Sequence, residues 1–125
     1  MHAASRGFTL IEMLIVMSIV ALLLSISVPR YFASVEKSKE AVLSENLRVL
    51  RTSIDKYYAD KGAYPLTLDD LVEHKYIRVV PMDPFTENNR SWIVILPQEA
   101  ELRGVADVKS GAAGSTSAGK PYEDL

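Results

Sequence analysis

The sequence contains no cysteine and only two histidines among its 125 residues. Without cysteine, the chain can build neither a disulfide framework nor a thiolate metal site. Acidic and basic residues nearly balance, at a formal net charge of −2, so no basic field is available to hold a phosphate backbone. The composition therefore excludes disulfide-stapled proteins and argues against a nucleic-acid partner.

Catalytic and phosphate-binding motifs are also missing. There is no GxSxG or HExxH string, no EF-hand loop and no phosphate-cradling glycine loop. A serine nucleophile needs a neighbouring base, and His74 is the only histidine beyond His2. A lone histidine without acidic partners at metal spacing is usually a solvated surface residue. We expect no enzymatic activity and assign His74 no role.

The sequence does have one long apolar run, Phe8 to Val28, whose only charged residue is Glu12. As a helix, these 21 residues would span roughly 30 Å, the thickness of the hydrocarbon core of a bilayer. The run is longer than the apolar stretch of a secretory signal peptide and has no small-residue cleavage site after it. Residues 8–28 are therefore expected to form a transmembrane helix, although the flanking charges do not decide its orientation.

The string "RGFTLIE" at the head of this run, with Pro29 at its end, resembles the N-terminus of type IV pilin-like proteins. Over its whole length, the chain is most similar to the major pseudopilins of type II secretion systems. The similarity extends through "DKYYADKGAYP" and "VPMDP". It implies that a prepilin peptidase removes residues 1–7 as a leader peptide by cutting between Gly7 and Phe8. Phe8 would then be N-methylated.

The same resemblance implies a function and a location. The chain would be a structural subunit of a periplasmic pseudopilus, a homo-oligomeric helical filament that acts in protein secretion. It would work with minor pseudopilins and an inner-membrane assembly platform. It would cross the bacterial inner membrane once, in contact with lipid, with its head in the periplasm. A type IV pilus pilin subunit is the alternative within the family, and a membrane-anchored periplasmic binding module is an alternative of another class.

Cleavage at Gly7 would give Glu12 a physical role. An unpaired carboxylate in hydrocarbon is costly, and so is the new amine of Phe8. In an array of parallel staggered helices, Glu12 of one subunit can pair with the Phe8 amine of its neighbour and fix the assembly register. The alternative is that Glu12 merely lies near the interface and reaches toward water.

Pro29 predicts a helix kink, because proline lacks an N–H donor and clashes with the carbonyl four residues earlier. It could mark only the exit from the membrane, or it could create a stretch that extends when subunits leave the bilayer. Beyond it, residues 29–61 form an amphipathic helical spine that ends before Gly62. Its apolar residues recur at intervals of three and four: Val35, Leu43, Leu47, Leu50, Ile54, Tyr57 and Tyr58.

Residues 62–125 are expected to form a globular periplasmic head. "YPLTLDDLVEHKYI" predicts a short helix capped by Thr67. "WIVIL" predicts a strand, and residues 102–108 its antiparallel partner. The tail, rich in glycine, serine and alanine, predicts a flexible C-terminal loop pinned by Tyr122. The fold class is α+β and pilin-like, with a long N-terminal helix, transmembrane and then amphipathic, packed against a small antiparallel sheet.

The resemblance also implies a calcium site, because the heads of major pseudopilins bind this ion in the loop after the sheet. Asp107 lies where such a ligand is expected. Calcium takes six to eight oxygens, several of them anionic, yet residues 108–122 include no aspartate or glutamate. We therefore expect no cofactor and a loop held by hydrogen bonds, with calcium at Asp107 as the alternative.

Overall fold

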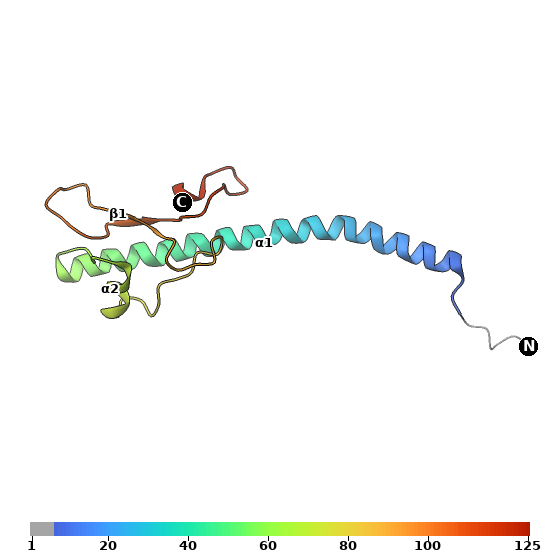
Figure 1. Cartoon of the computed structure of the whole chain (residues 1–125), viewed down its shortest axis with the longest axis horizontal. Coiled ribbons are helices and arrows are strands. Elements are labelled where there is room, and N and C mark those ends of the chain that lie inside the picture. Colours follow the sequence, from blue (N-terminus) through green and yellow to red (C-terminus); the bar gives the residue numbers. More distant parts are fainter. Residues whose placement is uncertain (1–6) are drawn as a thin grey trace, which may run out of the picture. The chain divides into compact units, whose positions relative to one another are not determined.

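The computed structural model describes residues 7–125, so the expected leader peptide lies outside the described residues except for Gly7. The chain divides into two compact units, Met1–Val35 and Glu36–Leu125. Helix α1, Leu10–Lys61, contributes its first part to one unit and its second part to the other (Figure 1).

In the N-terminal unit, α1 is apolar on all sides, and every residue from Gly7 to Ser34 is exposed. By length and composition, α1 is the one helix among residues 7–125 that could cross a membrane. A helix that is hydrophobic all round needs an apolar environment around it. Pro29 lies inside α1, and the helix continues through it. The kink expected there stays a prediction.

In the second unit, α1 is amphipathic as the spacing predicts. Its buried residues include Leu43, Leu47, Leu50 and Ile54, which recur every three or four positions. The expected stop is also confirmed: Gly62 has a φ of 68° and donates its N–H to the Tyr58 carbonyl. A residue in this left-handed conformation is a common end for a helix.

Helix α2, Leu68–Glu73, is the short helix that the sequence predicts, with Thr67 at its N-cap. The Asp70 carboxylate accepts hydrogen bonds from the N–H groups of Leu66 and Thr67, at 2.9 and 3.3 Å, and so ties the first turn to the chain before it. Leu71 is fully buried. The helix therefore serves packing.

The sheet consists of strands β1, Ile93–Ile95, and β2, Asp107–Lys109, paired antiparallel with Val94 opposite Val108. The sequence predicts that the partner strand begins at residue 102. This start was wrong, because β2 begins at Asp107. Gly104 has a φ of 105°, and Val105 donates its N–H to the Pro65 carbonyl at 2.7 Å. A Cβ at Gly104 would lie 2.5 Å from the Pro65 oxygen. The chain before β2 is therefore held against residues 64–65 by a turn that needs glycine.

One hydrophobic core joins the second part of α1, α2 and the sheet. Figure 1 shows α2 and the strands on different sides of this part of α1. The single tryptophan, Trp92, packs in this core and donates its indole N–H to the Pro81 carbonyl at 2.8 Å. The 3-10 helix η1, Tyr122–Asp124, follows the C-terminal loop, and Tyr122 stacks on Phe85 as the expected pin. The α+β class is confirmed. The core comprises Leu43, Leu47, Leu50, Ile54, Tyr57, Leu71, Val80, Trp92, Val105, Val108 and Tyr122.

Candidate functional site

Thr9 caps α1 directly after the expected cleavage bond. Its Oγ1 accepts a hydrogen bond from the N–H of Glu12 at 3.1 Å, and its carbonyl accepts one from Met13 at 3.2 Å. Threonine followed three positions later by glutamate is the spacing of a capping box. Thr9 was not among the predicted site residues, although this spacing was the signal that could have revealed it.

The Gly7–Phe8 bond lies in the non-helical segment before α1. The Phe8 residue is 77% exposed, and a Cβ placed on Gly7 would meet nothing within 4 Å. The folded chain therefore leaves this bond open and sets no steric demand of its own for glycine. Cleavage between these residues and N-methylation of Phe8 stay predictions.

Glu12 lies exposed in the first turn of the apolar part of α1. The sequence contains no lysine or arginine between Phe8 and Val28. Across residues 7–125, the ion pairs join Arg48 to Glu45 and Arg51 to Asp107, so Glu12 takes part in neither. If α1 is surrounded by hydrocarbon, this carboxylate needs a cationic partner from outside the apolar run, and its pairing with the Phe8 amine of a neighbouring copy stays a prediction.

Pro29 stands at the end of the apolar run, and two exposed aromatic residues follow it. Tyr31 and Phe32 pack edge to face with their ring centroids 5.8 Å apart. Tyrosine and arginine side chains suit the polar boundary of a bilayer, and Arg30 lies beside this pair. The arrangement favours the role of Pro29 as a marker of the membrane exit. It leaves the second role, an extensible stretch, open.

Asp107 is held by arginine. Its Oδ1 accepts hydrogen bonds from Nε of Arg51 at 2.9 Å and from the N–H of Val108 at 2.8 Å. Nη2 of Arg51 donates further to the carbonyl oxygens of Val108 and Leu125, at 3.0 and 2.7 Å. One guanidinium therefore joins α1, β2 and Leu125, the residue directly after η1. The sequence did not single out Arg51, because its partners lie more than fifty positions away.

The donors around Asp107 do not match those that calcium prefers. Within the part of the chain that the structure describes, no group of three or more histidine, cysteine, aspartate or glutamate residues is close enough to hold a metal ion. Residues 108–122 contribute Lys109 and Lys120 but no carboxylate. A six- to eight-oxygen shell with several anionic ligands therefore has too few acidic donors here. The expectation of no cofactor stays a prediction, with calcium at Asp107 as its alternative.

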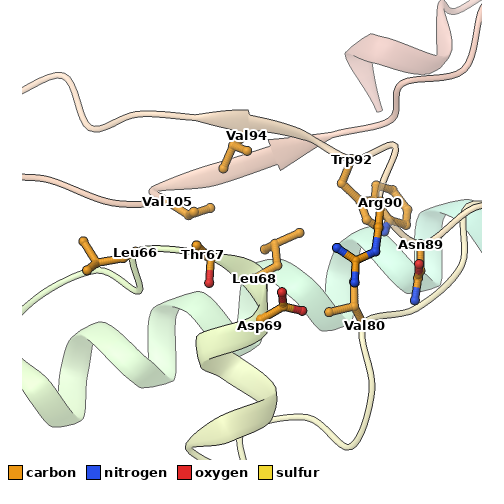
Figure 2. Close-up of a pocket in the computed structure, with 10 residues that line it drawn as sticks. All are labelled: Leu66, Thr67, Leu68, Asp69, Val80, Asn89, Arg90, Trp92, Val94 and Val105. Carbon is orange, nitrogen blue, oxygen red and sulfur yellow. The ribbon is translucent and has the colours of Figure 1, made fainter.

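A pocket of about 220 Å³ opens between the start of α2 and β1. Buried Val80, Trp92 and Val105 line it, and Figure 2 shows the charged ends of Arg90 and Asp69 on one side of it. Apolar walls with a few polar groups can hold an apolar side chain. The lining includes no cysteine or histidine.

Two tyrosines of the head have a raised pKa. Burial, with Glu36 and Glu40 nearby, raises the pKa of Tyr122 above its ordinary value. The hydroxyl of Tyr76 donates to Asp60 at 2.7 Å, and this hydrogen bond raises the pKa of Tyr76. His74 is exposed and lies edge to face against the Tyr57 ring, with ring centroids 5.6 Å apart.

Residues 2–28 match the family model of the prokaryotic N-terminal methylation motif. The type II secretion system core protein G of Klebsiella pneumoniae is 33% identical to the chain over 96 residues, which cover 64% of this chain and 69% of that protein. The protein of the same name in Escherichia coli is 29% identical over 110 residues, covering 75% of this chain and 74% of that one.

Type IV pilins are also similar to the chain. The type IV major pilin protein of Myxococcus xanthus is 28% identical over 111 residues, which cover 88% of this chain but only 46% of that protein. This chain thus spans less than half of that relative's length. No solved structure shows a significant match.

Proposed function

Because the chain belongs to the family of the type II secretion system core protein G, we propose that it is a structural subunit of a pseudopilus in type II protein secretion. It is made as a precursor, and a prepilin peptidase removes residues 1–7. The mature chain is anchored in the membrane by the apolar part of α1 and assembles into a helical filament of its own copies. Its head occupies the periplasm.

One observation carries this proposal. Glu12 is the single charge in the apolar run and lies on a helix that is exposed all round. The expected cleavage makes Phe8 the first residue and Glu12 the fifth, so one chain end offers a cation and an anion. Filament assembly gives each charge a partner on a neighbouring copy, and it also covers the apolar surface of α1.

The partners follow from this assembly. The prepilin peptidase recognises the N-terminal motif and lipid surrounds the anchor before assembly. An inner-membrane platform and minor pseudopilins support growth of the filament. The near-neutral charge of the chain favours no nucleic acid as a partner. No enzymatic step is assigned to the chain, since its relatives are structural subunits.

A type IV pilin subunit is the second candidate, and similarity to the Myxococcus xanthus pilin over 88% of this chain favours it. The two candidates share processing and assembly. They differ in where the filament forms and what fails without it. Deletion that abolishes secretion of exoproteins but leaves surface pili unchanged supports the pseudopilus, and loss of surface pili with normal secretion supports the pilin.

Processing and filament assembly, which both candidates share, are tested by mass spectrometry and electron microscopy. The mass of the protein from membranes should correspond to residues 8–125 with one added methyl group. Electron micrographs of cells that overproduce the chain should show filaments containing it. A full-length, unmethylated protein that forms no filament would instead support the membrane-anchored binding module, whose ligand would occupy the pocket in Figure 2.

A further inference from the structure

The C-terminal loop, residues 110–121, is attached to the rest of the head at its start and its middle. At its start, the hydroxyl of Ser110 donates to Oδ2 of the fully buried Asp83. In its middle, Ser117 donates twice to Glu40 on α1, from its N–H at 2.7 Å and from its hydroxyl at 3.2 Å. Directly after the loop, Tyr122 stacks on Phe85 with ring centroids 4.2 Å apart.

The loop presents hydrogen-bond donors to these carboxylates. Several of its carbonyl oxygens are engaged inside the loop or by the residue that follows it: Gly114 accepts from Tyr122, Thr116 accepts from Gly119, and Lys120 accepts from Thr116. A cation would need the opposite arrangement, with several carbonyl and carboxylate oxygens directed at one point. The donors of the loop therefore suit a negatively charged partner, and the Glu40 carboxylate is that partner.

The charges in and near the loop also argue against a cation site. The only charged residue of the loop is Lys120, a cation. The nearest expected calcium ligand, Asp107, already faces the permanent positive charge of Arg51 at 2.9 Å. A divalent ion at Asp107 would have to approach beside this guanidinium. The donor set thus disagrees with the calcium site that the family resemblance implies.

We infer that the Glu40 carboxylate holds the C-terminal loop in place without a metal ion, so that the head folds independently of calcium. A carboxylate that accepts a backbone N–H makes a charge-assisted hydrogen bond, which is stronger than a neutral one. Glu40 lies on the rigid spine of the head, which gives the loop a fixed point 77 positions earlier in the sequence. Glu40 acts as a positioning residue and takes part in no reaction.

The first test measures thermal unfolding of the full chain in detergent, followed by the fluorescence of Trp92, with either calcium chloride or EGTA present. The expected result is the same unfolding midpoint in both. A calcium site filled at a hundredfold excess over its dissociation constant would raise the midpoint by about 10 °C or more in a domain of this size. A rise of that kind, lost in Asp107→Asn, would overturn the inference.

The second test measures hydrogen exchange of the Ser117 amide in Glu40→Ala. Exchange should become several-fold faster, while Trp92 fluorescence shows that the core stays folded. The matched control is Glu45→Ala on the same helix, because Glu45 pairs with exposed Arg48. Exchange at Ser117 should be unchanged in this control. Unaltered protection of Ser117 in Glu40→Ala, or its restoration by calcium chloride, would contradict the role of Glu40.

Discussion

The backbone N–H of Glu12 lies 3.1 Å from Oγ1 of Thr9 and donates to it. The carboxylate to which we assign the register of assembly therefore belongs to the turn that Thr9 caps. This cap fixes the backbone directly after the expected cleavage bond. The backbone from Thr9 to Glu12, which directly follows Phe8, is thus an ordered turn, and this favours one repeating contact along a filament.

Replacement of the cap should loosen this turn. Thr9→Val keeps the shape of the side chain but removes the acceptor of the Glu12 N–H, which should cost the helix about 0.5–2 kcal/mol at its end. Amide hydrogen exchange at Glu12 in detergent should become faster, and Thr9→Ser should retain the protection. Equal exchange rates in the valine variant and the wild type would show that the cap is dispensable.

Gly7 should be required by the peptidase and not by the fold. A side chain at this position meets nothing within 4 Å in the chain, so Gly7→Leu should leave the head stable. The scissile bond, however, must come close to the enzyme's backbone, where a bulky side chain intrudes. Mass spectrometry of membranes should find the full-length precursor. Mature protein at the normal level would contradict this prediction.

Arg51 should matter more for stability than its one ion pair indicates. Arg51→Met removes the donors of Asp107, Val108 and Leu125 together, and loss of such hydrogen bonds costs about 1–3 kcal/mol. Asp107→Asn should cost less, because the two carbonyl contacts survive. The measurement is the free energy of unfolding in urea. Arg48→Met is the control: Arg48 is exposed, and its loss should cause no measurable change.

Alkaline pH should weaken the head through Tyr122. Its pKa is raised from the ordinary value of 10.0, first by burial and then by nearby Glu36 and Glu40. The folded state thus holds the phenolic proton more tightly than the unfolded state, so this stabilisation is complete below pH 10 and is lost as pH rises further. Tyr122→Phe should show a smaller loss of unfolding midpoint between about pH 9 and 11. Identical losses in both proteins would contradict the assignment.

Local patterns predicted the elements of the fold. The apolar run, the spacing from Leu43 to Tyr57, Gly62 and Thr67 each act on their own neighbours in sequence, so they predicted α1, its end and the start of α2. The start of β2 was missed because it depends on the contact between Gly104 and Pro65, which no local pattern records.

The contacts that attach the C-terminal loop could not be predicted either. Glu40 meets Ser117 and Arg51 meets Asp107 only after the chain has folded, and each is one charged residue among many on an exposed helix face. Glu12 was different, because a single carboxylate in an apolar run is unusual in itself and suggests a role from the sequence alone.

The central claim is that Glu12 sets the register of a filament, and Glu12→Ala tests it. The substitution leaves the Phe8 amine of each neighbour without a partner, and breaking a buried pair costs about 3–5 kcal/mol at every joint. Membrane insertion should not suffer, since the run becomes more apolar, and cleavage after Gly7 should continue. A mass that confirms processing separates this outcome from a failure of the peptidase.

The most direct measurement is the yield of crosslinked filaments sheared from cells that produce Glu12→Ala, compared with the wild type at equal amounts of processed protein. A register role predicts that the variant is processed, inserted in the membrane and absent from filaments, and that secretion stops. Filaments of Glu12→Ala at the wild-type yield would contradict this role and favour an anchored module in which the N-terminal helix is only a tether.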